Sequence, residues 1–188
     1  MPLEAARPPD LVSPAGERLW FSGDATETII KAIIPAGCAG PVLHRHLQTE
    51  EDVTVVSGRV RYHLEGRIHE LEPGDSLRIP RLARHRFENP YSEAAELEGH
   101  VHPGLVHEVL LRLLAGAFSR RRPNPLEVVV AFHDGDGYPA RIPAPIARAM
   151  VTVLRSVSET VGVARPFRAA HLPDHLLAGV PAPARRPR

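Results

Sequence analysis

The chain has 188 residues and a mass of 20.6 kDa, which suits one packed domain with an extension and excludes two ordinary catalytic domains. Its 23 basic and 22 acidic residues nearly cancel, so net charge draws it neither to nucleic acid nor to an anionic membrane. No apolar run approaches the roughly 20 residues that span a bilayer, and the first residues lack a secretion-signal pattern. Cys38 is the single cysteine, so no internal disulfide can form and we expect a cytoplasmic protein.

Residues 17 to 102 consist of short strand-like segments separated by turns that contain Gly and Pro. Residues 59–64 alternate polar and apolar side chains, as a half-buried strand does. Glu65-Gly66 then turns the chain back into a second strand over 67–71. Further strands are expected over 17–21, 26–34, 52–57, 76–79, 84–88 and 94–101. Short strands at this spacing predict a mainly β fold, an antiparallel sandwich or barrel.

After Pro103 the pattern changes to helical spacing. Apolar residues between Val106 and Ala117 recur at i, i+3 and i+4, which predicts an amphipathic helix of about three turns. The apolar run 126–132 suits a helix or a strand, and we favour a helix. A second helix is predicted over 145–161, with five apolar residues on one side: Ile146, Met150, Val153, Leu154 and Val157.

These changes in residue pattern along the chain predict four segments. We expect an N-terminal arm over 1–16, a β-barrel domain over 17–103 and a helical extension over 104–180 that packs on the barrel. Residues 181–188 are rich in Pro, Ala and Arg and cannot bury much apolar surface, so they are predicted to be a disordered tail.

One short stretch contains candidate metal ligands: His44 and His46, followed by Glu51. Alternate residues of a strand point to the same face, so the two imidazoles lie side by side, as a divalent transition-metal ion requires. Glu51 supplies an oxygen ligand if the chain turns after His46. A third imidazole must come from elsewhere, and His85, at the start of a later strand, is best placed.

These residues resemble the two sequence motifs of the cupin superfamily. Eight positions match in order: His44, His46, Glu51 and Gly58 in the first motif, and Gly74, Pro80, His85 and Asn89 in the second. Four residues separate His46 from Glu51 and six separate Glu51 from Gly58, as in the family. Two turn positions depart from the pattern: Leu82 replaces a glycine, and Gly37 is one place away from the usual first glycine.

The resemblance implies an antiparallel jelly-roll barrel of the cupin type, here with C-terminal α-helices added. It implies one divalent transition-metal ion, Fe(II), Mn(II), Ni(II) or Zn(II), held by His44, His46, Glu51 and His85. A cupin that keeps these residues but binds no metal is less expected, because four buried polar groups would lack partners. The resemblance also implies a homodimer, and we expect a small-molecule partner with no nucleic acid or membrane.

Residues outside the motifs leave alternatives open. Glu98 and His100 share one face of the predicted last strand. If that face lines the barrel, both are catalytic candidates beside Glu51; if it faces solvent, they form an ordinary polar edge. The helical extension is expected to pack outside the barrel or to cover its mouth, with His107 or Phe132 near the opening.

Three functions follow from a metal in such a barrel. We favour a metal-dependent enzyme that acts on a small aromatic or enolisable molecule, with a dioxygenase of the quercetinase type slightly ahead. Glu51 is then able to leave the ion and accept a proton. A non-redox cyclase or isomerase, similar to metal-dependent aromatic polyketide cyclases, is the alternative, because zinc or nickel would polarise a carbonyl. The third is a non-catalytic cupin that binds a small ligand.

Overall fold

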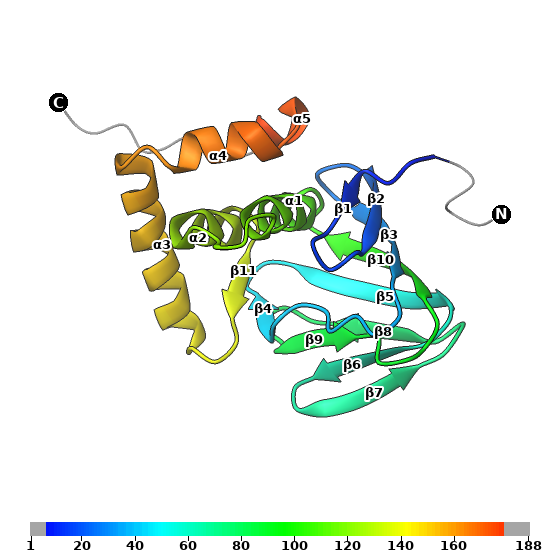
Figure 1. Cartoon of the computed structure of the whole chain (residues 1–188). Coiled ribbons are helices and arrows are strands. Elements are labelled where there is room, and N and C mark those ends of the chain that lie inside the picture. The colour runs from blue at the N-terminus through cyan, green and yellow to red at the C-terminus, as the bar shows by residue number, and fades with distance from the viewer. Residues whose placement is uncertain (1–6, 179–188) are drawn as a thin grey trace.

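The computed structural model describes residues 7–178, and its strands form two antiparallel sheets (Figure 1). The six strands of the first sheet are, in spatial order, β1 (Leu11–Val12), β2 (Arg18–Gly23), β3 (Thr28–Ile34), β10 (Ala95–His102), β5 (Glu50–Ser57) and β8 (Ser76–Ile79). The five strands of the second are β11 (Gly137–Pro139), β4 (His44–His46), β9 (His85–Glu88), β6 (Val60–Leu64) and β7 (Arg67–Leu71). The predicted antiparallel jelly roll with C-terminal helices is confirmed.

The barrel core lies between the two sheets. Alternate residues of β3 and β5 are buried, so each strand turns one face inward, as the period of two predicts. Val53 and Val55 of the first sheet share this core with Val60 and Tyr62 of the second. The inward face of β5 also includes Glu51, so this carboxylate is directed into the barrel.

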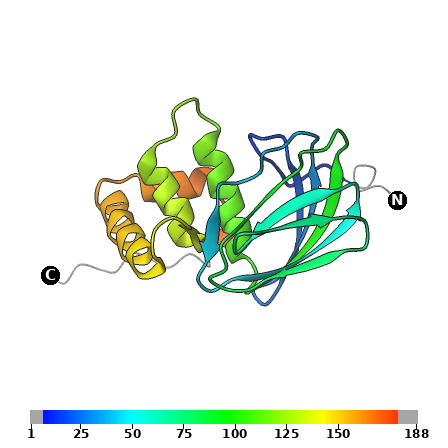
Figure 2. The ribbon, with the colours of Figure 1, turned by 90° about the horizontal axis from the view of Figure 1, so that it is seen from below.

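Among residues 7–178, five helices gather at one end of the barrel (Figure 2). They are α1 (Val106–Phe118), α2 (Pro125–Asp134), α3 (Ala144–Thr160), α4 (Ala164–His171) and α5 (Asp174–Leu177). Their own apolar core includes Leu113 of α1, Val130 of α2 and Phe167 of α4. The helices predicted near 106–117, 126–132 and 145–161 are therefore confirmed, and none of the described helices is long and apolar enough to cross a bilayer.

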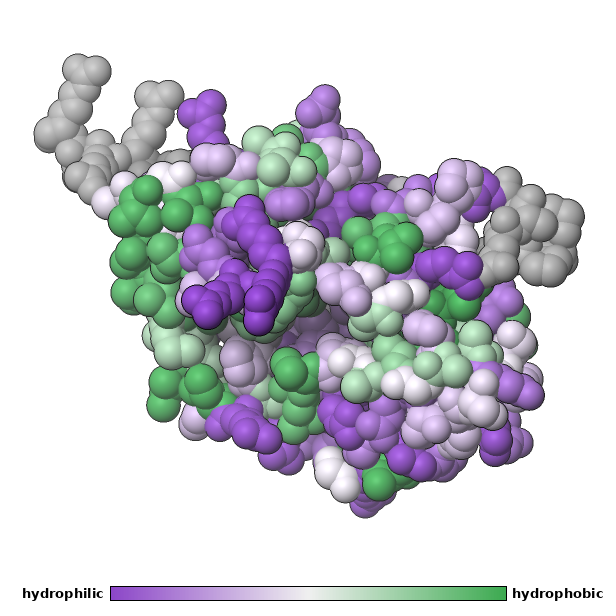
Figure 3. Space-filling model, viewed as in Figure 1, coloured by the Kyte–Doolittle hydropathy of each residue, from purple (hydrophilic) through white to green (hydrophobic). Residues whose placement is uncertain are grey.

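The predicted apolar side of α3 is not the buried side. Small residues, Ala147, Val151 and Ser158, face the neighbouring helix, because close packing of α3 leaves little room there. The larger side chains at Ile146, Met150, Val153 and Val157 are exposed, and they form part of the apolar surface over α3 in Figure 3.

Two of the predicted segments contain strands that the sequence did not indicate. Part of the expected N-terminal arm is β1, which pairs with β2 and lines the barrel cavity through Leu11. The extension adds a strand as well as helices, because β11 pairs with β4 beside the predicted metal ligands. The tail predicted over 181–188 lies outside the described residues.

Candidate metal centre

Strand register brings the three predicted histidines together. His44 of β4 and His85 of β9 are direct cross-strand partners, and His46 lies two residues further along β4 on the same face. Glu51 enters from β5 of the other sheet. The two motifs are about forty residues apart in sequence. Pairing of β4 with β9 brings the histidines together, and Glu51 reaches them from the opposite sheet.

The distances between these side chains fit one shared ion. Glu51 Oε1 lies 3.1 Å from His46 Nε2 and 3.4 Å from His85 Nε2. The donor nitrogens of His44, His46 and His85 all lie within 4.8 Å of one another. Adjacent donors on an octahedral ion with bonds of about 2.1 Å are about 3.0 Å apart, and opposite donors about 4.2 Å. The three histidines therefore gather as a single site requires, and Glu51 adjoins two of them, His46 and His85.

Backbone carbonyls orient all three imidazoles. The Nδ1 atoms of His44, His46 and His85 lie 2.9, 3.0 and 3.0 Å from the carbonyl oxygens of Val42, Asp136 and Ala83. A carbonyl can only accept, so each Nδ1 carries the proton and donates it. Each Nε2 then presents a lone pair, which is the tautomer and orientation that metal-binding histidines adopt.

Burial and neighbouring groups shift the pKa values of three histidines and of Glu51 at this site. Burial, followed by His85 and His46, lowers the pKa of His44 well below its ordinary value, and burial lowers the pKa of His107 to about 4. Burial also acts to lower the pKa of His46, but contact with Glu51 raises it above the ordinary value. For Glu51, burial acts to raise the pKa, and the surrounding histidines hold it well below the ordinary value instead. The site thus contains the carboxylate of Glu51, with the imidazoles of His44 and His107 neutral at pH 7.

His107 lies outside both sequence motifs and yet adjoins this site. It lies in the first turn of α1, with its Nδ1 3.8 Å from Glu51 Oε1 and its ring centroid 5.1 Å from that of His46. The sequence placed it only near the barrel opening. No local spacing relates His107 to the motif histidines, because a helix and two strands of different sheets bring them together.

Asp136, in the turn before β11, supports the site from the extension. Its backbone oxygen accepts the hydrogen bond from His46 Nδ1. Its Oδ2 accepts from the backbone nitrogens of Gln48 and Thr49 at 2.7 and 3.0 Å, and from the Thr49 hydroxyl at 3.1 Å. One residue therefore holds both a predicted ligand and the turn that leads to Glu51.

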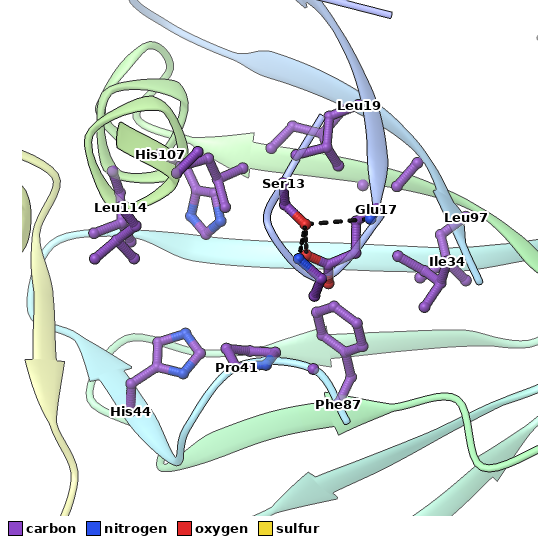
Figure 4. Close-up of a pocket in the computed structure, with 18 of the residues that line it drawn as sticks. Ser13, Glu17, Leu19, Ile34, Pro41, His44, Phe87, Leu97, His107 and Leu114 are labelled. Carbon is purple, nitrogen blue, oxygen red and sulfur yellow. Dashed lines mark hydrogen bonds between the residues drawn. The ribbon is translucent and has the colours of Figure 1, made fainter. Parts of the chain in front are cut away.

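A cavity of about 390 Å³ adjoins the histidines and runs between the sheets and the helices. Apolar side chains make up most of its wall, among them Ile30, Val53, Phe87, Leu97, Leu111 and Phe132. Figure 4 shows His44 and His107 reaching into it from opposite sides, with Ser13 and Glu17 further along. Within the described chain, no lysine or arginine lines this cavity.

Glu98 and His100 are not at this site. Their neighbours Leu97 and Val101 fill the inward face of β10, so Glu98 and His100 take the outer face. There Glu98 pairs with Lys31 at 3.1 Å, and His100 Nδ1 lies 2.9 Å from Glu27 Oε1. Of the two alternatives open from the sequence, the polar edge is the one observed, because the face they share is the surface of the barrel.

Residues 31–109 match the family Cupin_2, whose description is "Cupin domain". The chain contains a cupin domain. Several cupin structures resemble it, including an RmlC-like cupin from Shewanella frigidimarina (21% identity, 56% of this chain, 90% of that chain, TM-score 0.48). KdgF from Halomonas sp. is similar too (20% identity, 54% of this chain, 90% of that chain, TM-score 0.47).

Among curated proteins, the chain resembles "Polyketide synthase CurC" from Streptomyces cyaneus. The two sequences are 40% identical over 60 residues, which is 32% of this chain and 39% of the relative. The cupin thus matches well under half of the length of that protein.

Proposed function

We propose that this cupin is a metal-dependent enzyme that acts on a small, mainly apolar molecule with an aromatic or enolisable oxygen group. The cavity carries this proposal. It joins a cluster of three oriented imidazoles and one carboxylate to about 390 Å³ of largely apolar space. Because no lysine or arginine of the described residues lines it, a phosphorylated or polyanionic substrate would lose its hydration without charge compensation.

The chain's own groups have defined roles in this proposal. His44, His46, His85 and Glu51 hold the ion, which supplies Lewis-acid stabilisation of charge on a carbonyl or phenol oxygen. The apolar walls exclude water, which strengthens that electrostatic effect. Tyr62 lines the cavity, and burial together with Glu51 and Glu17 raises its pKa, so its hydroxyl stays protonated and can donate a hydrogen bond to a substrate oxygen.

A non-redox cyclisation or isomerisation is the reaction we favour. The support is the partial similarity to a protein named as a polyketide synthase, since polyketide chains are rich in enolisable carbonyls. In such a step a C–H proton adjacent to a carbonyl is lost to a base, and its electron pair moves onto the carbonyl oxygen as an enolate. Oxygenation of a similar molecule, which the sequence placed slightly ahead, is the second candidate.

Elemental analysis followed by an oxygen-electrode assay tests the proposal. The purified protein is loaded with Zn(II) or Fe(II) and given polyphenols and 1,3-diketones of up to about three fused rings. Conversion without oxygen uptake supports the cyclase or isomerase, and uptake that depends on substrate and Fe(II) supports the oxygenase. If the protein binds no divalent metal but retains an organic ligand tightly, the enzyme proposal is wrong and the cupin is a binding protein.

We also propose that the cupin works in the cytoplasm as a homodimer. The first rests on its single, buried and free cysteine, Cys38, and the second on the cupin resemblance. Light scattering on the purified full chain measures the mass, which is expected to be twice 20.6 kDa.

A further inference from the structure

We infer that His107 is a fifth protein ligand of the metal ion, so that the helical extension completes a site which the barrel begins. The inference deepens the proposed function and rests on it, because it requires that the cupin binds a divalent metal. It adds to the barrel ligands a donor from α1, outside both sequence motifs.

The start of α1 is tied to the barrel, which fixes where His107 points. The backbone nitrogen of Leu105 donates to the buried Thr28 hydroxyl at 2.6 Å, and Leu105 has a φ of 64°. Gly104 donates backbone hydrogen bonds to the 25–26 turn, and a Cβ there would collide with the Asp24 carbonyl oxygen. His107 therefore begins a helix with little freedom to rotate, and its ring is directed into the cavity (Figure 4).

Three unpartnered buried atoms meet at this point. His107 Nδ1, Glu51 Oε1 and His46 Nε2 are all buried, and none has a hydrogen-bond partner. Although His46 Nε2 is 3.1 Å from Glu51 Oε1, the proton of His46 is on Nδ1, so Nε2 has none to donate; the 3.8 Å from His107 Nδ1 to Glu51 is too long for a hydrogen bond. Buried polar atoms rarely lack partners, and a shared cation satisfies all three at once.

The geometry of the three donors agrees with a shared ion. The donor atoms of His46, Glu51 and His107 lie within 4.8 Å of one another, as do those of His44, His46 and His85. His46 belongs to both groups, so one ion bound by all five donors requires the two groups to draw together around it. Five protein ligands on a six-coordinate ion leave one position, so a substrate would bind through a single oxygen. This favours the non-redox reaction over one that needs substrate and dioxygen side by side.

Cobalt binding by the full-length protein tests the inference, with visible absorption and chelator competition as readouts. His107→Phe keeps a planar ring of similar volume and removes both nitrogens. We expect this variant to bind Co(II) at least about tenfold more weakly and to change the intensity of the d–d bands, because a donor is lost. Val109→Ala is the matched control: it loosens α1 on the face away from the cavity and should keep the wild-type spectrum and affinity.

Each outcome has one reading. A His107→Phe spectrum and affinity equal to those of the wild type would overturn the inference but leave the metal-dependent function intact. A wild-type protein that binds no Co(II) would overturn both. Metal-free thermal unfolding shows whether the variant folds; if His107→Phe does not, His107→Leu takes its place with the same readouts and the same expected result.

Discussion

At the scale of single residues, Asp136 lies outside both sequence motifs but forms several hydrogen bonds at the candidate metal centre. Its backbone orients His46 and its carboxylate accepts three hydrogen bonds from Gln48 and Thr49. It has a φ of 57°, a conformation that aspartate tolerates better than most residues. Asp136 thus links the turn before β11 to the turn before Glu51, although about ninety residues lie between them.

We predict that Asp136→Ala weakens metal binding about 10- to 100-fold, because His46 and Glu51 lose the turn that positions them. A competition titration with a chromophoric chelator measures this affinity. The control is Asp52→Ala, which removes the same side chain from the outer face of β5 beside Glu51. Equal affinities for Asp136→Ala and the wild type would show that the hydrogen bond from His46 Nδ1 to the backbone carbonyl of residue 136 is enough to position the ligands.

Glu88 carries a prediction about acid stability. Hydrogen bonds from His63, Arg86 and Arg61 lower its pKa from 4.5 to about 2, with that from His63 the largest contribution. A lowered carboxyl pKa stabilises the fold above pH 4.5, and this contribution is lost as the pH falls toward 2. Glu88→Gln should therefore lower the free energy of unfolding by about 0.5–1 kcal/mol near pH 7, with the gap closing below pH 4.5.

Urea titrations of both proteins across this pH range measure the gap. Glu93→Gln, at an exposed loop position, should match the wild type throughout. A difference between Glu88→Gln and wild type that stays constant from pH 7 to pH 3 would contradict the prediction, because it would mean that charge plays no part.

At the scale of elements, the short strand β4 depends on the extension. It has one registered pair with β9, His44 with His85, but three with β11. Arg45 adds hydrogen bonds from Nη2 to the carbonyl oxygens of Ala140 and Ile142 at 2.5 and 3.3 Å. Two of the predicted metal ligands therefore lie on a strand that is held largely by residues far along the chain.

Arg45→Ala should free residues 137–142 from β4. Hydrogen bonds that involve a charged group contribute about 1.5–3 kcal/mol each, so we expect a loss of about 2 kcal/mol in unfolding free energy. Hydrogen–deuterium exchange should rise at 137–142 and at β4, with a several-fold loss of metal affinity. Arg84→Ala, which removes an exposed pair with Glu65, is the control and should change neither measurement. Unchanged exchange at 137–142 would show that β11 pairs without Arg45.

At the scale of the whole molecule, the cavity joins the barrel to the helices. Its wall includes residues of both sheets and of α1 and α2, such as Val53, Phe87, Leu111 and Phe132. A metal at the centre would contact groups from both sheets at once, so binding and folding are thermodynamically linked.

We therefore expect metal to raise the unfolding temperature. At a free Zn(II) concentration 100 times the dissociation constant, the added stability is about 2.7 kcal/mol, which for a chain of this size is about 5–10 °C. Scanning calorimetry of chelated and Zn(II)-loaded protein measures the shift. His85→Ala, which lacks one barrel ligand, should show little shift. An equal shift in His85→Ala and the wild type would place the stabilising metal elsewhere.

Much of the fold and three of the candidate ligands, His44, His46 and Glu51, could be predicted from local signals, whereas His85 was expected from the second motif. Alternation of polar and apolar residues marks a strand wherever it occurs, and the spacing of His44, His46 and Glu51 is set within eight residues of chain. Helices near 106–117 and 145–161 follow from the same kind of periodicity. For these features, neighbours in sequence are also neighbours in structure.

Only the tertiary structure decided which face of each element is buried and which distant residues meet. Period two gives a strand two faces without saying which is inside, so the sequence left the orientation of Glu98 and His100 open, and the structure has them on the outer face. The larger apolar residues of α3 are exposed for a similar reason: packing of the helices selected the side with small residues. His107 and Asp136 reach the site through α1 and the turn before β11, and contacts across 56 to 90 residues leave no periodic trace in the sequence.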